Sequence, residues 1–335
     1  MSAVEKVLKL LRDSGGAMSG EEIAKRLGIS RNSVWKAVKK LQADGYQIDA
    51  KTNCGYTLLS ESCTLNPETI SRSLTGAARI AKIEIRDSVS STNTVLKELA
   101  EQGKPEGTVL IARQQSAGKG RMGRSFFSPK GTGLYMSILL RPKFSAEESL
   151  FITTAAAVAV AGAVEEATGR TAKIKWVNDV YLDGYKVCGI LTEASIDFET
   201  RGLNYAVLGI GVNLQEPEGD FSEEIREVAG ALFEKAPPGA QVKLAAGILN
   251  RFFDFYSSLT ALSFLPEYRE RSLLTGARIH FFYGNESYTG KVIGIDETVR
   301  LLVELEDGTR KAFSAGEVAI EKDFLNWLRQ PKEKE

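Results

Sequence analysis

The residues best suited to chemistry lie between positions 117 and 129, in the stretch AGKGRMGRSFFSP. Its glycines match the G-x-G-x-x-G dinucleotide pattern, and it misses a P-loop only because Arg124 stands where that motif has lysine. Both motifs need a helix directly after the glycines, so that the N–H groups of its first turn meet the phosphates. Pro129 and two more glycines prevent a helix for about ten residues, so neither motif is present.

What remains is a basic, glycine-rich loop that can bind an anion. Glycine permits a close approach of the backbone to a ligand, and the planar forks of arginine fit carboxylate or phosphate oxygens. The alternative is a solvated surface loop. Against it, the loop follows an apolar strand, Phe126 and Phe127 are able to fold over a ligand, and a second charged cluster, KWVNDVYLDGYK, begins at Lys175. The candidate residues of the loop are Gly118, Lys119, Gly120, Arg121 and Arg124.

The composition is that of a soluble globular protein with two or three domains. Of the 335 residues, 43% are hydrophobic and 26% are charged, with 43 Lys and Arg against 43 Asp and Glu. This length is too great for one ordinary core. Residues 1–60 carry ten Lys and Arg against six Asp and Glu, and such a local excess of positive charge favours a nucleic-acid module.

Cysteine and histidine usage argues against several kinds of site. Cys54, Cys63 and Cys188 have no metal-ligand spacing, which fits a reducing cytosol. The single histidine, His280, lies in a strand-like segment far from the glycines, so a Ser-His-Asp or His-metal mechanism is not expected. No signal peptide is recognised, and the alanine-rich apolar stretch at 148–169 predicts a buried helix. We therefore expect a cytoplasmic protein.

Residues 1–62 have the pattern of a winged helix-turn-helix. Ser19 and Glu22 have capping-box spacing at the start of one helix, and a turn follows at Gly28. The next helix has apolar residues at helical spacing, and its other face is basic, with no acid before Asp44. This combination is typical of a DNA-binding domain.

The predicted wing is the hairpin YQIDAKTNCGYTLL, which turns near Asn53, Cys54 and Gly55. In such domains the second helix of the motif enters the major groove of DNA. The alternative is a small helical interaction domain with a solvated basic face. The predicted contacts to base edges or phosphates are Ser30, Arg31, Asn32, Ser33 and Lys36.

The rest of the chain predicts two further modules. Residues 66–272 alternate helix and strand, with hairpin-linked strands such as the pair that turns at Asp183, and this indicates an α+β fold with a mixed sheet. The long apolar helix is capped by Ser145 and Glu148. Residues 273–325 contain only short strands with glycine turns, which predict an SH3-like β-barrel.

Four segments resemble the biotin–protein ligase family. They are SSTN at 90–93, QQSAGKGRMGR at 114–124, KWVNDVYLDGYKVCGIL at 175–191 and GIGVNL at 209–214. The pair G-[RK]-G-R-x-G-R and K-W-x-N-D, in this order and spacing, is highly specific. With the winged helix in front, the resemblance covers all three modules and extends to the bacterial proteins that are both biotin ligase and biotin-operon repressor.

The resemblance implies a two-step reaction. The carboxylate of biotin attacks the α-phosphate of ATP, giving biotinyl-5′-AMP and pyrophosphate. The adenylate then acylates a lysine of a biotin carboxyl carrier protein domain, such as that of acetyl-CoA carboxylase. Two unit charges brought to ~4 Å at a partly shielded site repel by roughly 4 kcal/mol, which preoriented positive charge must offset. Also implied are Mg²⁺, operator DNA of biotin genes and a ligand-promoted homodimer.

The functional positions of the family are carried over residue by residue. Arg121 and Lys186 match the catalytic Arg and Lys at the reacting centre, and Asp179 is the candidate Mg²⁺ ligand. The biotin-binding positions are Ser91, Thr92, Asn93, Gln115, Lys119, Gly120, Arg121 and Lys186. The ATP-binding positions are Gly118, Arg121, Arg124, Asn178, Asp179 and Asn213.

The chain departs from the family pattern at three positions. Lys119 stands where the family usually has Arg, Phe126 where it usually has Trp, and Val177 where it usually has Pro. Lys119 keeps the positive charge without the planar fork, and Phe126 keeps an aromatic lid. The chemistry implied by the resemblance is therefore retained.

Plainer roles remain open for several residues. Lys186 could be an exposed hairpin lysine, Asp179 the end of a strand and Ser91 a helix cap, whereas Lys175 and Trp176 could serve either the fold or the site. At the level of function, three alternatives remain: a lipoate-type ligase, a metabolite-sensing repressor without ligase activity, and an enzyme whose helix-turn-helix is degenerate.

Overall fold

The computed structural model divides the chain into two compact units. Residues 1–69 with 237–242 form one unit, and the rest of the chain forms the other. The predicted domain boundaries, 1–62, 66–272 and 273–325, stay predictions. The residues that the structure describes are 2–43, 45–51, 55–60, 64–143, 149–196, 202–217, 226–284, 286–314, 317–319 and 329.

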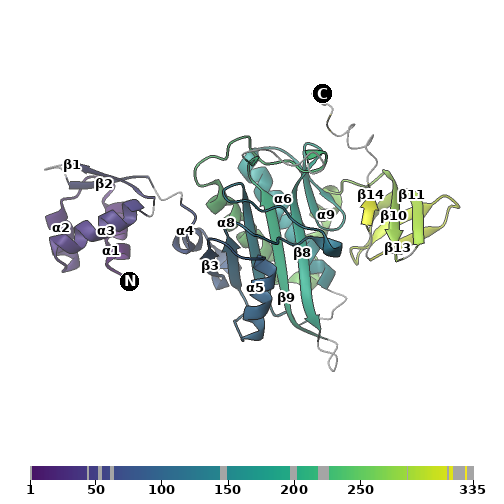
Figure 1. Cartoon of the computed structure of the whole chain (residues 1–335), viewed down its shortest axis with the longest axis horizontal. Helices are drawn as coiled ribbons and strands as arrows, with labels where there is room; N and C mark the ends of the chain where they lie inside the picture. The colour runs from purple at the N-terminus through teal and green to yellow at the C-terminus, as the bar shows by residue number, and fades with distance from the viewer. Residues whose placement is uncertain are drawn as a thin grey trace. The chain divides into compact units, whose positions relative to one another are not determined.

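The first unit contains the predicted winged helix-turn-helix elements (Figure 1). They are α1 (Ala3–Ser14), α2 (Gly20–Leu27), α3 (Arg31–Ala43), β1 (Gln47–Lys51) and β2 (Gly55–Ser60). The hydroxyl of Ser19 caps α2 by accepting the N–H of Glu22 at 3.1 Å, and Gly28 ends that helix with a φ of 66°. The wing is the antiparallel β1–β2 hairpin, whose predicted turn at Asn53 and Cys54 lies outside the described residues.

The apolar faces of the three helices form the core of this unit. Val34, Val38 and Leu41 of α3 are buried, as their spacing predicts, and they belong to one cluster with Leu8 and Ile23. Because α3 buries this stripe, its basic residues are left on the opposite, exposed face.

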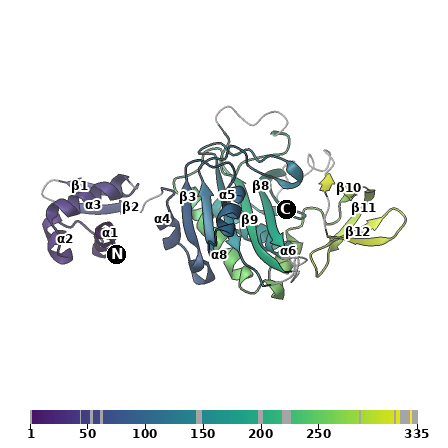
Figure 2. The same cartoon turned by 60° about the horizontal axis from the view of Figure 1, so that its bottom comes forward.

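A seven-stranded mixed sheet organises the second unit and confirms the α+β prediction (Figures 1 and 2). Its strands are β3 (Lys82–Arg86), β4 (Thr108–Ala112), β5 (Gly133–Leu140), β6 (Ala172–Lys175), β7 (Asp179–Leu182), β8 (Tyr185–Ile196) and β9 (Leu203–Asn213). Their order is β3-β4-β5-β9-β8-β7-β6, and only β3 and β4 run parallel among these strands. The predicted β7–β8 turn contains Asp183 and Gly184, both with positive φ, as such hairpins need.

Helices lie on both faces of this sheet (Figure 1). On one face, α5 (Thr92–Glu101) packs against β4, β5 and β9. On the other, α6 (Ser149–Thr168) packs against β6, β7 and β8, with α8 (Ala240–Tyr256) beside it. The shorter helices are α4 (Pro67–Arg72), α9 (Leu265–Glu270) and the 3₁₀ turns η1 (Gly76–Ile80), η2 (Arg121–Gly123) and η4 (Leu259–Ala261).

The long helix α6 is a core helix, as predicted. By length and composition it is apolar enough to cross a membrane, but 72% of its apolar window is buried inside the protein. Its predicted caps, Ser145 and Glu148, lie outside the described residues. The burial of α6 therefore explains its apolar sequence without a lipid environment.

The C-terminal strands form a five-stranded antiparallel sheet (Figure 2). They are β10 (Arg278–Tyr283), β11 (Glu286–Ile295), β12 (Leu301–Leu305), β13 (Arg310–Phe313) and β14 (Glu317–Ala319). The order is β13-β12-β11-β10-β14, and Phe281, Val292, Val303 and Phe313 are buried in it. Short antiparallel strands of this kind agree with the predicted small β-barrel.

Candidate active site

The glycine-rich loop folds back on itself as a small hairpin. The N–H of Gly120 donates to the carbonyl of Arg124 at 2.7 Å, and the N–H of Phe126 donates to the carbonyl of Gly118 at 2.8 Å. A Cβ on Gly118 would lie 2.3 Å from the carbonyl oxygen of Phe126, so only glycine fits there. At the tip, Met122 has a φ of 54°. This hairpin fixes the backbone from which the basic side chains project.

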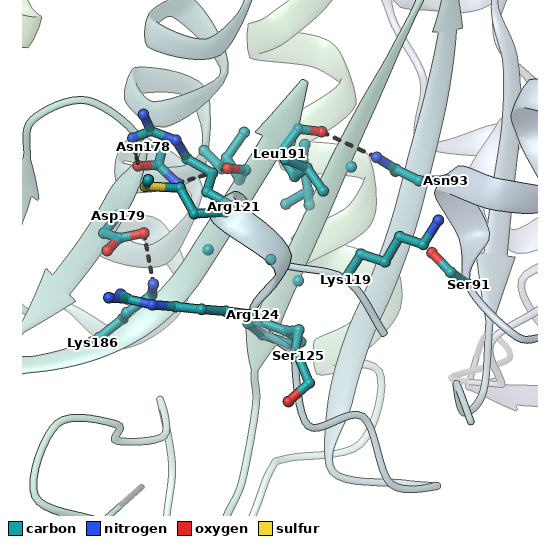
Figure 3. A pocket seen from close by; sticks show the side chains of 18 of the residues that line it. Ser91, Asn93, Lys119, Arg121, Arg124, Ser125, Asn178, Asp179, Lys186 and Leu191 are labelled. Carbon is teal, nitrogen blue, oxygen red and sulfur yellow. Dashed lines mark hydrogen bonds and ion pairs between the residues drawn. The ribbon is translucent and has the colours of Figure 1, made fainter. Parts of the chain in front are cut away.

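These side chains reach a pocket on the α5 face of the seven-stranded sheet (Figure 3). Strand residues alternate between faces, so Gly209 and Gly211 of β9 share the face of Val207, which packs against α5. Both glycines line the pocket. The predicted residues that also line it are Ser91, Thr92, Asn93, Gln115, Lys119, Gly120, Arg121, Arg124, Asn178, Asp179 and Lys186. The predicted residues that do not are Gly118 and Asn213.

One end of the pocket gathers positive charge. Arg121, Arg124, Lys175 and Lys186 are named the cationic end, and Asp179 lies among them. Lys186 Nζ is 2.7 Å from Asp179 Oδ1, and the two side chains are only 29% and 15% exposed. Lys186 is therefore not an exposed hairpin lysine. Because four cations share one carboxylate, this end retains positive charge for an anionic ligand.

Lys186 is held by its backbone from a neighbouring segment. Its N–H donates to the carbonyl of Val228 at 2.8 Å, and its carbonyl accepts the N–H of Gly230 at 2.9 Å. A Cβ on Gly230 would lie 2.6 Å from Cβ of Tyr185, so the segment approaches β8 closely only because residue 230 is glycine. These contacts aim the Lys186 side chain instead of leaving it to sample solvent.

Asn178 joins the loop to the sheet. Its Nδ2 donates to the carbonyl of Ile190 at 2.7 Å, and its Oδ1 accepts from Arg121 Nη1 at 3.1 Å (Figure 3). Through these two bonds, Asn178 orients Arg121 within the pocket. The peptide bond between Trp176 and Val177, just before Asn178, is cis.

The side chains of Lys175 and Trp176, at and just after the end of β6, make different contacts. The indole N–H of Trp176 donates to the carbonyl of Val299 at 3.0 Å, so Trp176 connects the strand to the C-terminal sheet, although it also lines the pocket. Burial, helped by the positive charges of the other cations and opposed by Asp179, lowers the pKa of Lys175 to about 8. Lys175 is thus a pocket residue whose role the sequence left undecided.

The other end of the pocket carries neutral hydrogen-bonding groups. Ser91, Thr92, Asn93 and Gln115 are named the neutral end, and Lys119 extends toward it in Figure 3. The N–H of Thr92 donates to Gln115 Oε1 at 2.8 Å, and the Thr92 hydroxyl oxygen lies 3.1 Å from the same atom. The Ser91 hydroxyl makes no capping bond to the backbone of α5. Neutral donors and acceptors of this kind suit a polar, uncharged ligand group.

Ser137 supports the neutral end from below and was missed by the sequence reasoning. It lies in the middle of β5 and is fully buried. Its hydroxyl oxygen is 2.6 Å from Asn93 Oδ1 and 2.7 Å from Thr92 Oγ1. The only signal in the sequence is a single polar residue within the apolar run GLYMSILL, because a buried hydroxyl requires a partner.

The predicted aromatic lid is not found. The ring of Phe126 lies 2.6 Å from where a Cβ would stand on Gly211 and 3.3 Å from that position on Gly189, so it packs on the sheet and forms part of the pocket wall. Phe127 is 49% exposed and does not line the pocket. The aromatic side chain therefore shapes the pocket from beneath, and does not close over it.

Asn213 points elsewhere than predicted. Its Nδ2 donates to the carbonyl of Gly230 at 3.0 Å, which ties β9 to the segment that holds Lys186. Asn213 is the last residue of β9 and lies on the same face of that strand as Gly209 and Gly211, which line the pocket.

Among the described residues, no three His, Cys, Asp or Glu side chains gather to form a metal cage. Asp179 is the one carboxylate among the residues that line the pocket. A single carboxylate suits a hard cation that keeps most of its ligands from water and phosphate, as Mg²⁺ does. It does not suit a zinc or calcium site.

The predicted DNA-binding residues lie along α3 and its N-terminal edge. Ser30 accepts the N–H of Ser33 at 3.1 Å, so Ser30 caps the helix whatever else it contacts. Arg31, Asn32 and Lys36 are exposed. Trp35, which the sequence reasoning did not select, is 49% exposed in the same helix.

A mixed sheet that carries an uncharged polar site joined to a cationic site, in a chain that also contains a winged helix, defines a DNA-binding protein with an anion-activating active site. Three family models match the chain: the biotin/lipoate A/B protein ligase family at residues 85–213, an HTH domain at 4–57 and the biotin protein ligase C-terminal domain at 275–320. The chain belongs to the biotin–protein ligase family, in the branch of the bifunctional ligase/repressors.

Relatives of known name support this membership. The chain is 33% identical to "Bifunctional ligase/repressor BirA" of Bacillus subtilis, over 92% of this chain and 96% of that one. It is 25% identical to the protein of the same name from Escherichia coli, over 94% and 96%. A solved biotin protein ligase from Aquifex aeolicus, in complex with biotin and ATP, matches with a TM-score of 0.58 and 30% identity, over 71% of this chain and 97% of that one.

Proposed function

We propose that this protein is an ATP-dependent biotin–protein ligase that also represses transcription. The observation that carries the ligase function is one pocket with a neutral end and a cationic end. The ureido ring of biotin needs neutral hydrogen-bonding partners, whereas its carboxylate and the phosphates of ATP need positive charge. The order of the two ends matches the order of these groups along biotinyl-5′-AMP.

In the first step, a carboxylate oxygen of biotin attacks the α-phosphorus of ATP. The bond from this phosphorus to the bridging oxygen breaks, and pyrophosphate leaves. Arg121 and Lys186 lie where they would stabilise the charge that develops at the reacting oxygens, and Arg124 would hold the phosphates. No protein nucleophile is required, which agrees with a pocket lining that contains neither His nor Cys.

Asp179 and Asn178 would serve the nucleotide. Asp179 would contribute one ligand to a divalent cation bound with ATP, and such an ion would supply positive charge to the phosphates. Without the ion, Asp179 pairs with the Lys186 ammonium at 2.7 Å.

In the second step, the neutral amine of an acceptor lysine attacks the acyl carbon of the adenylate. The amide bond forms, AMP leaves and the amine loses its proton. The acceptor we propose is the lysine of a biotin carboxyl carrier protein domain, such as that of acetyl-CoA carboxylase. The relatives named for this acceptor include a biotin–[acetyl-CoA-carboxylase] ligase of Mycobacterium tuberculosis, 28% identical over 71% of this chain.

The first test measures pyrophosphate release from ATP with and without biotin, followed by mass spectrometry of the bound product. Biotin-dependent release, with biotinyl-5′-AMP retained, is expected. Biotin binding without release would leave a sensor-repressor and would refute the ligase function. Competition with lipoate tests the lipoate-type alternative, since such a ligase would prefer lipoate, whose dithiolane ring cannot use the hydrogen-bonding groups of the neutral end.

The repressor function depends on the winged helix. The exposed basic face of α3 fits the major groove of an operator, and we propose that the operator belongs to biotin genes. A two-fold operator needs a two-fold protein, so we propose a homodimer promoted by biotinyl-5′-AMP, in the cytoplasm. The same molecule would then be both reaction intermediate and corepressor.

A gel-shift assay on the upstream DNA of biotin genes tests this role, with and without biotin and ATP. Deletion of residues 1–62 should end DNA binding and spare ligation. Lys36→Ala should weaken binding and reduce its dependence on salt, whereas Lys25→Ala, a control in α2, should not. Equal loss in both variants would contradict the proposed use of α3.

A further inference from the structure

Asn93 lines the pocket, but its amide is already fully engaged. Its Nδ2 donates to the carbonyl of Leu191 at 3.2 Å (Figure 3) and to Glu193 Oε2 at 2.8 Å, and its Oδ1 accepts from Ser137 at 2.6 Å. A Cβ on Gly209 would stand 2.2 Å from Asn93 Oδ1, so the amide is wedged against β9. Asn93 therefore has no N–H left to donate to biotin.

Glu193 controls the direction of this amide from outside the pocket. It is partly buried, and its second oxygen, Oε1, accepts from Lys97 Nζ at 2.7 Å. Burial alone would raise the pKa of Glu193, but the hydrogen bonds from Lys97 and Asn93 outweigh it and leave that pKa below its usual value. Glu193 is therefore ionised at neutral pH, and an ionised carboxylate only accepts hydrogen bonds.

The direction of every hydrogen bond that follows is then set. Because Glu193 and the Leu191 carbonyl both accept, Asn93 must turn its two N–H groups toward them and its oxygen toward Ser137. Ser137 must donate its only proton to that oxygen. The Thr92 hydroxyl, 2.7 Å from Ser137, must therefore donate its own proton to Ser137, so it has only lone pairs left for a ligand. Thr92, which lines the pocket, is thus presented as an acceptor.

We infer that Glu193 is a positioning residue for biotin, which acts through Asn93 and Ser137 to present Thr92 as the acceptor of a ureido N–H. The inference rests on the proposed function, because it assigns the ureido ring to the neutral end. Glu193, Lys97 and Ser137 do not line the pocket, so each of them acts only through its neighbours.

Replacement of Glu193 by glutamine should reverse the directions of the hydrogen bonds that connect Glu193 to Thr92. Glutamine has one oxygen, and the charged ammonium of Lys97 competes most strongly for it. The amide N–H₂ of Gln then faces the N–H₂ of Asn93, so Asn93 must turn, and Ser137 and Thr92 turn with it. Removal of Lys97 as well would free the Gln oxygen for Asn93 and restore the original directions.

The test is calorimetric titration of the full-length protein with biotin, without ATP. Glu193→Gln should weaken biotin binding about 10-fold, the value of one hydrogen bond in a buried site, and leave the KM for ATP within about twofold. Lys97→Met should change biotin affinity less than about threefold. The double variant Lys97→Met/Glu193→Gln should regain most of the lost affinity, which is a non-additive result.

Three controls keep the outcomes distinct. Glu165→Gln breaks a comparable ion pair, with Arg271, and should lower stability without weakening biotin binding. If Glu193→Gln does not fold, Ser137→Ala tests the same path and should also weaken biotin binding selectively.

If wild-type protein binds no biotin, the proposed function fails. If it binds and Glu193→Gln matches wild type, or the double variant is no better than Glu193→Gln, the positioning role is overturned.

Discussion

The neutral and cationic ends of the pocket are built in opposite ways. At the neutral end, the polar groups of Thr92, Asn93 and Gln115 are hydrogen-bonded to one another, to β8 or to the loop residue Ser128. At the cationic end, four positive side chains face Asp179 as the one carboxylate among the described pocket residues. The first end is uncharged and hydrogen-bonded within the protein, whereas the residues that line the second end carry an excess of positive charge.

This difference indicates how the two ends contribute to function. A satisfied network has fixed directions and rejects ligands whose donors and acceptors do not match, so the neutral end should determine which molecule binds. Uncompensated charge held in place stabilises negative charge that develops during reaction, so the cationic end should determine the rate. Substitutions at the two ends should therefore affect different kinetic parameters.

The largest effect is expected for Lys186→Ala. Loss of one fixed cation at the reacting centre should lower the rate of adenylate formation by about 10²–10³-fold, while biotin affinity without ATP falls much less. Stopped-flow measurement of pyrophosphate release gives this rate. Lys291→Ala, at an exposed position of β11, is the control and should react as wild type. Full activity of Lys186→Ala would remove the assigned role and leave the two ends equivalent.

Arg121→Gly should have the next largest effect. Without the guanidinium that Asn178 orients at 3.1 Å, the adenylate should dissociate about 10-fold faster, the value of one charge-assisted hydrogen bond. The released adenylate would acylate lysines indiscriminately, which mass spectrometry of a bystander protein such as serum albumin detects. Unchanged release of the adenylate would show that the cationic end retains it without Arg121.

Thr92→Val tests the neutral end by removing the hydroxyl at nearly constant volume. We expect biotin binding to weaken about 10-fold and the rate of adenylate formation at saturating biotin to change by less than about threefold. Saturation kinetics separate the two. Ser195→Ala, at the other end of β8, is a hydroxyl deletion that should change neither. A lower rate at saturation would mean that the two ends are not independent.

The elements that follow local rules were predictable from the sequence. The α3 face, the Gly28 turn and the β7–β8 turn at Asp183 depend on helical spacing, a helix-ending glycine and positive φ within a few residues of chain. The residues of the pocket were identified through motif resemblance, because the segments that form it are spread along the chain from Ser91 to Gly211.

The side-chain positions of Phe126, Asn213 and Ser137 differ from the prediction or were missed by it. They depend on strand register, which local sequence patterns do not specify. Gly189 and Gly211 are direct partners across β8 and β9, and their missing side chains leave the flat surface on which Phe126 lies. Nothing near Phe126 in the sequence indicates that surface. Asn213 likewise has the alternation of a pocket residue, but a segment distant in sequence supplies its partner, the carbonyl of Gly230. Ser137 becomes a site residue only because β5 lies beneath α5.

The smallest predicted effect is the uptake of a proton by Lys175 when ATP binds. This uptake reports on the positive charge of the cationic end. Its pKa of about 8 lies below the ordinary lysine value of 10.5, so at pH about 8 only about half of the molecules carry the proton. The phosphates of ATP favour the charged form and should raise this pKa. ATP binding at pH 8 should then take up a fraction of a proton, measured by calorimetry in buffers of different ionisation enthalpy.

The sign of the accompanying stability change follows from the same shift. The native state binds fewer protons than the unfolded state between pH about 8 and 10.5, so the contribution of Lys175 to stability rises with pH across that window and is fully unfavourable below it. Lys175→Met should therefore raise the Tm of the ligand-free protein at pH 7, lose this advantage toward pH 10.5, and abolish the proton uptake. Lys173→Met, on the same strand outside the pocket, should keep the uptake. Persistent uptake in Lys175→Met would assign it to another group and would mean that the positive charge of the cationic end is compensated before ATP arrives.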